Sequence, residues 1–268
     1  MLTHLDLFSG IGGFTKAGEL VGGITTTQCI EREKDAQLVL RSHWSGIPIH
    51  DDIRTYSPRI REFDLFTIGF PCTGTSNAGT RTGLDHPESA LWRESLRCIC
   101  IGRPQFIVVE QPEGFVQRGL RTILGGLRMA GYNFDPPLLL SAKELGAMHQ
   151  RNRVFIVSYT NELQFKNQPT CWYDQMREMV QRQKANSRWL SVERTCDCTD
   201  DGIPRGLVRC PLAVPTNTPG RIRSRILAGR TVTPPQAAIS LTRVLYLNSL
   251  TNWAFITKGS IFISPKRH

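Results

Sequence analysis

The sequence contains no apolar run long enough to cross a bilayer, so a protein built from membrane-spanning helices is not expected. The first residues, Met1 to His4, lack a basic segment followed by an apolar stretch, and we therefore expect a cytoplasmic protein without a secretion signal. No internal repeat is visible. With 40% hydrophobic and 21% charged residues, the 268-residue chain has the composition and length of one sizeable α/β domain with a small insertion.

The eight cysteines do not form a convincing disulfide or zinc pattern. Several fall inside predicted core elements of a chain without an export signal, so we expect reduced thiols. The densest group is Cys196 and Cys198, with Cys171 and Cys210 elsewhere in the chain. Its one-residue gap is tighter than the spacing of ordinary structural zinc sites, so no metal is expected.

Positive charge is in excess: the formal net charge is +10 and the pI is about 9.5. This balance favours an anionic partner, of which nucleic acid is the commonest. Guanidinium groups on irregular, proline-rich backbone suit phosphate contacts, although a solvated basic face is the alternative. The late arginines concerned are Arg205, Arg209, Arg221, Arg223, Arg225 and Arg230.

Up to Tyr159 the chain alternates short apolar runs with longer amphipathic ones. The apolar runs predict strands at residues 5–8, 26–30, 63–70, 105–110, 137–140 and 153–158. The amphipathic runs predict helices at residues 34–43, 88–101 and 120–130. This alternation predicts an α/β fold with a doubly wound, mostly parallel sheet covered by helices.

The pattern dissolves after residue 160, where only residues 173–184 look helical. It returns near Val232, where Pro234 and Pro235 open a helix with an apolar face. We therefore divide the chain into a catalytic domain, a small irregular insert and a C-terminal segment that returns to the catalytic domain. Their predicted bounds are 1–160, 161–220 and 221–268.

Residues 5–14 read as a strand, a glycine turn and the opening of a helix. The glycines let the backbone approach a ligand closely, and the helix N-terminus favours an anionic group. Glu31 ends the second predicted strand, at the spacing from which an acid reaches ribose hydroxyls, and Asp52 follows at the next strand end, ahead of the apolar run at 63–70. Two strand-end acids beside a glycine loop favour an adenosine-containing cofactor over a bare phosphate.

A thiol and a carboxylate follow the next two predicted strands. Phe70-Pro71-Cys72 closes an apolar run, and Glu110 closes the strand after it. The carboxyl ends of parallel strands line one crevice, so Cys72 could be a nucleophile facing the same substrate as Glu110. The alternatives are a small core cysteine and a solvated strand-end acid.

Taken together and in this order, these blocks resemble those of the DNA cytosine C5 methyltransferases. The matching blocks are residues 6–14, Glu31, Asp52 and Ile53, residues 69–79, Glu110, residues 146–155 and residues 229–237. The resemblance implies a Rossmann-like methyltransferase domain with a small target-recognition insert, S-adenosyl-L-methionine as cofactor, and a short double-stranded DNA site as substrate, methylated by base flipping. We expect a monomer, and the resemblance leaves room for a cognate restriction endonuclease.

The same resemblance assigns roles to individual residues. It implies catalytic roles for Cys72, Glu110, Arg151 and Arg153, where Arg151 and Arg153 lie at i and i+2 on an extended segment and point the same way. The implied cofactor-binding residues are Phe8, Gly10, Gly12, Gly13, Glu31, Asp52, Ile53, Phe70, Leu91 and Val232. The implied DNA-binding residues are Ser76, Arg205, Arg209 and Arg230, and no metal ligand is implied.

The chain departs from the family pattern at a few positions. The family usually has Gln where this chain has Thr73, Asn-Val where it has Gln111-Pro112, and Gln where it has His149. Arg230 replaces a commoner Asn beside the expected cofactor pocket. The alternatives are therefore a catalytically silent DNA-binding relative and an RNA cytosine methyltransferase. A nicotinamide dehydrogenase is more remote, because hydride transfer does not call for a Pro-Cys pair.

Overall fold

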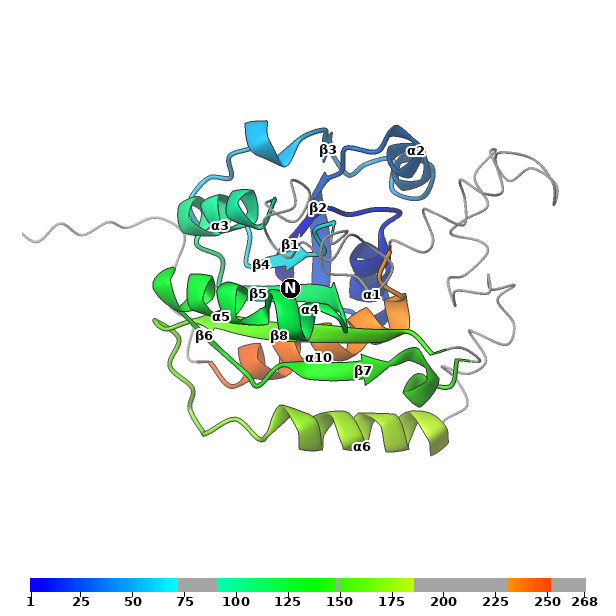
Figure 1. The fold of residues 1–268 in the computed structure, drawn as a ribbon, viewed down its shortest axis with the longest axis vertical. Helices are drawn as coiled ribbons and strands as arrows, with labels where there is room; N and C mark the ends of the chain where they lie inside the picture. The colour runs from blue at the N-terminus through cyan, green and yellow to red at the C-terminus, as the bar shows by residue number, and fades with distance from the viewer. Residues whose placement is uncertain (72–90, 148–149, 186–230, 252–268) are drawn as a thin grey trace, which may run out of the picture.

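The computed structural model describes residues 1–71, 91–147, 150–185 and 231–251, and an eight-stranded sheet lies at the centre of this part (Figure 1). The strand order is β3-β2-β1-β4-β5-β8-β6, and β7 pairs with β8 outside this path. The strands are β1 (Leu2–Leu7), β2 (Ile24–Ile30), β3 (Ile49–His50), β4 (Leu65–Ile68), β5 (Phe106–Pro112), β6 (Tyr132–Phe134), β7 (Leu138–Ser141) and β8 (Asn152–Thr160).

The sheet is mostly parallel, as predicted. The pairs β1–β2, β1–β4, β2–β3 and β4–β5 are parallel, whereas β8 is antiparallel to β5, β6 and β7. Among the described strands, β8 therefore runs against the other seven. The predicted strand at 63–70 is shorter in the structure, Leu65–Ile68, and the sequence did not predict β3 or β6.

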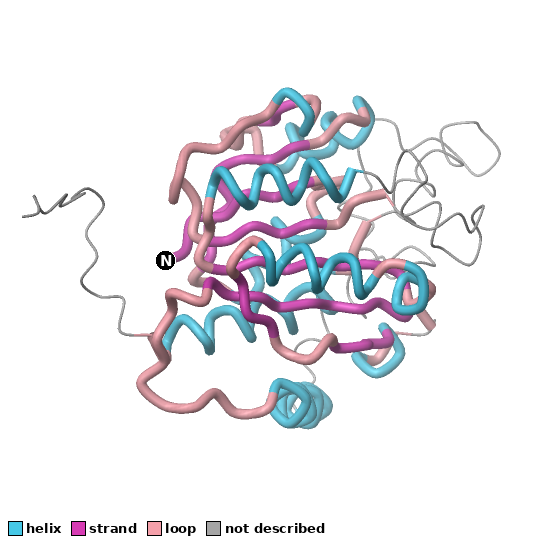
Figure 2. Tube along the Cα trace, turned by 60° about the vertical axis from the view of Figure 1, so that its left-hand side comes forward, coloured by secondary structure: helices cyan, strands magenta, loops and turns pink. Residues whose placement is uncertain are grey.

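Helices cover both faces of the sheet (Figure 2). The helical segments are α1 (Gly13–Val21), α2 (Lys34–His43), α3 (Leu91–Gly102), α4 (Phe115–Arg118), α5 (Leu120–Met129), α6 (Trp172–Ala185) and α10 (Pro234–Ser249), with 3-10 turns η1 (Ile53–Thr55) and η3 (Ala142–Leu145). The prediction for residues 34–43 is confirmed to the residue. None of the helices in the described part of the chain combines the length and hydropathy of a membrane span.

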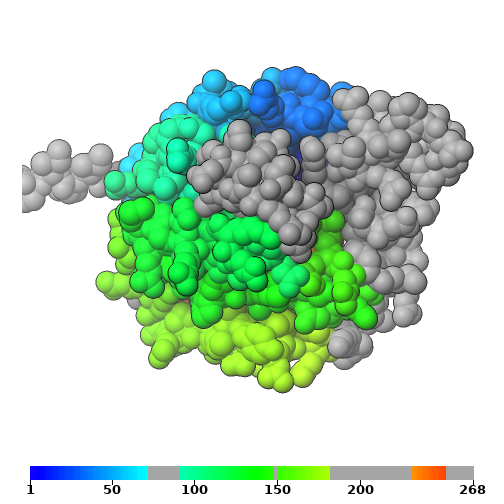
Figure 3. Space-filling model, in the orientation of Figure 1, coloured from blue at the N-terminus to red at the C-terminus, as the bar shows by residue number. Residues whose placement is uncertain are grey.

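The alternation of side chains along β5 separates two apolar cores. Phe106 and Val108 pack with α1, α6 and α10, whereas Ile107 and Val109 pack with α3, α4 and α5. Residues of α3, α4 and α5 also form much of the surface seen in Figure 3, above α6. The two-residue period therefore assigns Glu110 to the α10 face of the sheet and its neighbour Gln111 to the α3 face.

Helix α6 is anchored to the rest of the fold by a buried arginine. Arg243 of α10 is 1% exposed, and its Nε and Nη2 donate to the two carboxylate oxygens of Asp135 at 2.8 and 3.0 Å. Its Nη1 donates to Gln175 of α6 at 2.8 Å. Trp172 and Met176 of α6 belong to the same apolar core as α10, so α6 packs on the catalytic fold.

A chain of buried polar side chains crosses the strands below the glycine loop. Thr67 donates its hydroxyl hydrogen to Asp6 Oδ1 at 2.8 Å, so it can only accept from His4 Nε2, which lies 2.7 Å away. Because burial lowers the pKa of His4 and keeps the ring neutral, its Nδ1 accepts from the Thr26 hydroxyl at 2.8 Å, while Thr15 of α1 donates to Asp6 Oδ2 at 3.0 Å. The hydrogen-bond order thus defines a neutral His4 protonated on Nε2.

Burial shifts the pKa values of the two titratable groups in this chain in opposite directions. It lowers the pKa of His4 from 6.5 to about 3 and raises the pKa of Asp6 from 3.8 to about 7. The stability that His4 contributes is present above pH 6.5 and is lost as the pH falls toward 3. The stability linked to Asp6 is present below pH 3.8 and is lost as the pH rises through 7, so the two effects oppose each other.

We predict that Asp6→Asn removes the opposing contribution of Asp6, so that the dependence of stability on pH that comes from His4 can be measured. Between about pH 4 and pH 6.5 the variant should lose stability on acidification, relative to the wild type, by up to about 1.4 kcal/mol per pH unit. Urea unfolding across this range measures the difference. The control is Asp64→Asn, a carboxylate bonded to Thr3 outside the His4 chain. Equal pH slopes for the two variants would contradict the assignment.

Candidate active site

The strand-end residues singled out by the sequence lie along one edge of the sheet. The register pairs Leu7 of β1 with Ile30 of β2 and with Ile68 of β4, and pairs Ile68 with Val109 of β5. The segments that follow these residues are therefore neighbours: the glycine loop after β1, Glu31 after β2, residues 69–71 after β4, and Glu110 near the end of β5. This edge is the place where α/β sheets bind ligands.

The glycine loop turns sharply between β1 and α1. Phe8, Gly10 and Gly12 have positive φ angles of 60°, 55° and 88°, a region that glycine adopts readily and phenylalanine rarely does. Gly12 is the N-cap residue of α1 and provides no side-chain cap, so the first amides of a nine-residue helix are available to an anionic group.

Glu31 closes the glycine loop against the second strand. Its Oε2 accepts from the Gly10 amide and its Oε1 from the Glu33 amide, both at 2.7 Å. Removal from water raises the pKa of Glu31, and these two backbone hydrogen bonds oppose the rise. A carboxylate has about four acceptor sites, so each oxygen can still accept from a ligand hydroxyl.

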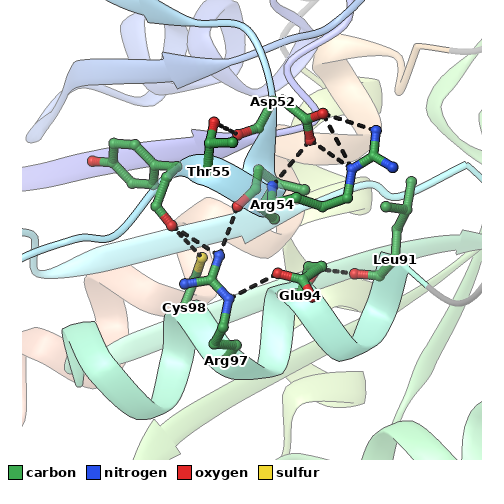
Figure 4. A network of polar contacts seen from close by, with 10 residues as sticks. Asp52, Arg54, Thr55, Leu91, Glu94, Arg97 and Cys98 are labelled. Atoms are coloured by element: carbon green, nitrogen blue, oxygen red, sulfur yellow. Dashed lines mark hydrogen bonds and ion pairs between the residues drawn. The ribbon is translucent and has the colours of Figure 1, made fainter.

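Asp52 caps the 3-10 turn η1, which contacts α3, and its carboxylate is held by Arg54 (Figure 4). The Asp52 carboxylate accepts from the Arg54 amide at 3.0 Å and pairs with Arg54 Nη2 at 2.8 Å, and these contacts lower the pKa of Asp52. The following Ile53 is buried, and its carbonyl accepts from Arg97 Nη2 of α3 at 2.7 Å. Leu91 packs against the same apolar core as Ile53.

The remaining predicted cofactor residues also converge on this edge. Phe8 meets Phe70 edge to face, with ring centroids 6.5 Å apart, and Phe70 in turn contacts Trp92 of α3. On the other side of the loop, a Cβ atom added to Gly13 would collide with Val232. The structure thus brings Phe8 and Phe70 together, and places Val232 against the opening of α1.

Glu110 forms a buried ion pair at the end of β5. It is 7% exposed, and its Oε1 lies 2.7 Å from Arg153 Nε. Burial raises the pKa of Glu110, while the charges of Arg153 and Arg151 oppose the rise. A Cβ atom on Gly69 would lie 3.5 Å from Glu110 Oε2, so this carboxylate sits directly over the backbone that leads to Pro71.

Two glutamines at this site were not assigned a role from the sequence. Gln111 is 1% exposed and its Nε2 donates to the Phe70 carbonyl at 3.1 Å, which ties β5 to the segment preceding Cys72. Gln236, in the first turn of α10, bonds to the carbonyls of Leu140 and Arg151. Gln111 had one sequence signal, its departure from the family pattern; Gln236 lies in the matching block 229–237, but no role was assigned to it there.

Several predicted site residues lie outside the described residues: Cys72, Ser76, Arg205, Arg209 and Arg230, together with the departures Thr73 and His149. Within the described residues, no three His, Cys, Asp or Glu side chains are grouped as a metal site. The described cysteines, Cys29, Cys98, Cys100 and Cys171, are free thiols, and Cys171 is exposed.

Fold and sheet-edge residues together define an α/β protein with a mostly parallel sheet, whose predicted cofactor residues gather at one edge. The family model for C-5 cytosine-specific DNA methylase matches residues 2–196, and the chain belongs to this family. The Glu110–Arg153 ion pair, the glycine loop and Glu31 all lie within the matched region, whereas Val232 and Gln236 lie beyond it.

Curated relatives carry type II methyltransferase names. The chain is 33% identical over 174 residues to "Type II methyltransferase M.Bsp6I" of Bacillus sp. (strain RFL6), covering 62% of this chain and 55% of the relative. It is 31% identical over 262 residues to "Type II methyltransferase M.CviJI" of Paramecium bursaria Chlorella virus IL3A, covering 96% of this chain and 63% of the relative. The chain thus spans roughly half to two-thirds of the length of the curated relatives it matches.

Solved structures share the fold. The S. pombe Dnmt2 methyltransferase superposes with a TM-score of 0.61 at 16% identity, covering 93% of this chain and 99% of that chain. A putative DNA modification methyltransferase encoded within a prophage of E. coli gives a TM-score of 0.60 at 12% identity, covering 93% and 100%. These superpositions support the Rossmann-like fold.

We predict that Glu31→Ala weakens binding of S-adenosyl-L-methionine by about 1–3 kcal/mol, because a ligand hydroxyl loses its acceptor and the Gly10 amide loses its bond. Titration calorimetry measures the change. The matched control is Asp51→Ala, a carboxylate at the adjacent strand end whose side chain is 59% exposed and pairs with Lys34. Full affinity in the Glu31 variant would show that this carboxylate does not face the cofactor.

Proposed function

We propose that the chain transfers a methyl group from S-adenosyl-L-methionine to C5 of cytosine in double-stranded DNA. The observation that carries the proposal is the buried Glu110–Arg153 pair, which lies over Gly69, three residues before Cys72. A buried carboxyl of raised pKa, beside the backbone that leads to a cysteine in the sequence, suits covalent catalysis on a pyrimidine.

The residues at the edge fit an S-adenosyl-L-methionine molecule. The uncapped first turn of α1 suits its carboxylate, Glu31 suits its ribose hydroxyls, and Asp52 lies at the next strand end toward adenine. Phe8 and Phe70 supply an apolar wall between these groups and the ion pair. When bound, the cofactor supplies an electrophilic methyl group on a sulfonium.

The chemistry assigned to the protein's own residues follows from the low nucleophilicity of cytosine C5. The Cys72 thiolate adds to C6, and the electron pair released into the ring makes C5 an enamine carbon that accepts the methyl group. Loss of the C5 proton then expels the thiolate. Glu110 in its protonated form, which burial favours, donates a proton to N3 during the addition and takes it back as the thiolate leaves.

The arginines position this carboxylate. Arg153 holds Glu110 Oε1, and Arg151 adds positive charge nearby while its Nη2 bonds to the Thr231 carbonyl at 2.7 Å. Each of these contacts fixes a side chain that is at most 16% exposed, so the pocket is ordered before substrate enters. A base inside a duplex cannot reach such a pocket, so the target cytosine is flipped out.

The DNA partner is proposed from charge and from the family. A net charge of +10 favours a polyanion, and the segment 161–220 together with Ser76 and Arg230 is assigned to DNA contacts. A segment this small suits a short site. The type II names of the curated relatives support the proposal of a restriction-modification setting with a cognate endonuclease, and we further propose that the protein is a monomer.

We predict that Cys72→Ser abolishes methyl transfer and leaves cofactor affinity nearly unchanged, because a hydroxyl is a far weaker nucleophile at neutral pH. Double-stranded DNA carrying 5-fluorocytosine at the target should remain covalently attached to the wild type, since fluorine does not leave as a proton does. Bisulfite sequencing of host DNA identifies the methylated site. A methyl-transfer assay with transfer RNA in place of the DNA duplex tests the alternative substrate. Full activity of the Ser variant, or methylation of RNA alone, would overturn the proposal.

We predict that Glu110→Gln lowers the turnover number by ~10²–10³ and weakens DNA binding less, because an amide meets part of the base edge but transfers no proton to N3. Radiolabelled methyl transfer and a gel-shift assay separate these effects. Glu113→Gln, three residues further along the chain and bonded to Asn152, serves as the control. An unchanged turnover number in the Glu110 variant would remove Glu110 from the reaction.

A further inference from the structure

Gln236 joins three segments that are far apart in the chain. It lies in the first turn of α10 and is fully buried. Its Nε2 donates to the carbonyls of Leu140 and Arg151 at 2.9 and 2.7 Å, and its Oε1 accepts from the Thr233 hydroxyl at 2.7 Å. Both amide hydrogens and the amide oxygen are thereby used, so the orientation of the side chain is fully determined.

Arg151 is held at both ends by this region. Its carbonyl accepts from Gln236, and its Nη2 donates to the Thr231 carbonyl at 2.7 Å. Arg151 is also two residues before Arg153, which pairs with Glu110. Any displacement of the Arg151 backbone therefore shifts the start of β8 and the guanidinium that holds Glu110.

The opposite side of the same segment touches the glycine loop. Thr231 Oγ1 would lie 2.8 Å from a Cβ atom on Gly10 and lies 3.5 Å from the Ile11 amide. The helices α1 and α10 pack against each other behind this contact (Figure 1). The segment 231–236 thus connects the glycine loop, which is assigned to the cofactor, with the Glu110–Arg153 pair, which is assigned to the target cytosine.

We propose that Gln236 is a positioning residue for methyl transfer, which sets the separation between the cofactor loop and Glu110 by clamping Arg151 to residues 231–233. The inference rests on the proposed function. Transfer requires donor and acceptor atoms in contact, and a misplacement of about 1 Å far from the reacting atoms lowers a rate by about 10²-fold. A buried amide with three hydrogen bonds resists such displacement, whereas an apolar side chain of equal length does not.

The test compares Gln236→Met with a matched control. Methionine keeps the length and fills the volume but makes none of the three hydrogen bonds. Ser240→Ala removes a hydrogen bond of equal burial one turn further along α10, where Ser240 Oγ donates to the Ala237 carbonyl at 2.7 Å. Urea unfolding and circular dichroism establish that each variant is folded under the assay conditions.

With folded protein, Gln236→Met should lower kcat for methyl transfer to DNA by about 10- to 100-fold with little change in KM for DNA, and should move the acid limb of its pH profile, because Glu110 and Arg153 are no longer held in register. Ser240→Ala should keep the kcat and the pH profile of the wild type. If Gln236→Met does not fold, Thr233→Val, which removes only the bond to Oε1, should show the same changes at smaller amplitude.

Equal kcat and pH profiles in Gln236→Met and Ser240→Ala would overturn the inference and leave the proposed function standing, since both enzymes would be active. A loss of kcat in proportion to lost stability, with an unchanged pH profile, would likewise overturn it in favour of a purely structural role. A wild-type protein that methylates neither DNA nor transfer RNA would overturn both.

Discussion

The buried ion pair between Glu110 and Arg153 is the interaction around which the active edge is arranged. The side chains of Glu110 and Arg153 are only 10% and 16% exposed. Two charges so far removed from water are tolerated because Glu110 Oε1 and Arg153 Nε lie 2.7 Å apart. Removing one partner would leave the other uncompensated, at a cost of about 3–5 kcal/mol. The same surroundings act on the pKa of Glu110, which burial raises while the charges of Arg153 and Arg151 oppose the rise.

The direction of β8 makes this pair possible. In a parallel sheet every strand begins at the edge opposite the active site, so residues at the start of a strand lie far from the chemistry. Because β8 is antiparallel to β5, its first residues reach the carboxyl edge, and the register sets Arg153 opposite Pro112 and Phe155 opposite Glu110. The reversal of one strand therefore brings both arginines to the crevice.

The C-terminal segment links the glycine loop, proposed to bind the cofactor, with the Glu110–Arg153 pair, proposed to bind the target cytosine. Thr231 and Val232 fill the space left by Gly10 and Gly13, and a side chain at either glycine would displace them. The buried Arg243–Asp135 pair then holds α10 in place against α6 and the connection between β6 and β7. The glycine loop near the start of the sequence therefore packs against the segment that leads into α10.

Elements with a strong local signal were predictable from the sequence. Helix α2 matches its predicted bounds, and the continuous apolar runs of β4 and β5 mark strands buried on both faces. Strand β6 was missed because three residues carry too little periodicity. The burial of Trp172 and Met176 could not be foreseen, because they pack against α10, which follows much later in the sequence.

The sequence by itself determined the residue types at each strand end, and with them the glycine loop, Glu31, Glu110 and the arginine pair, because these follow from local pattern and from family resemblance. Only the tertiary structure decided which atoms meet: Gly10 with Glu31, Gln111 with Phe70, and Gln236 with Arg151. In each of these contacts one partner is a backbone group. Every residue carries such a group, so no sequence pattern indicates which one a side chain will bind.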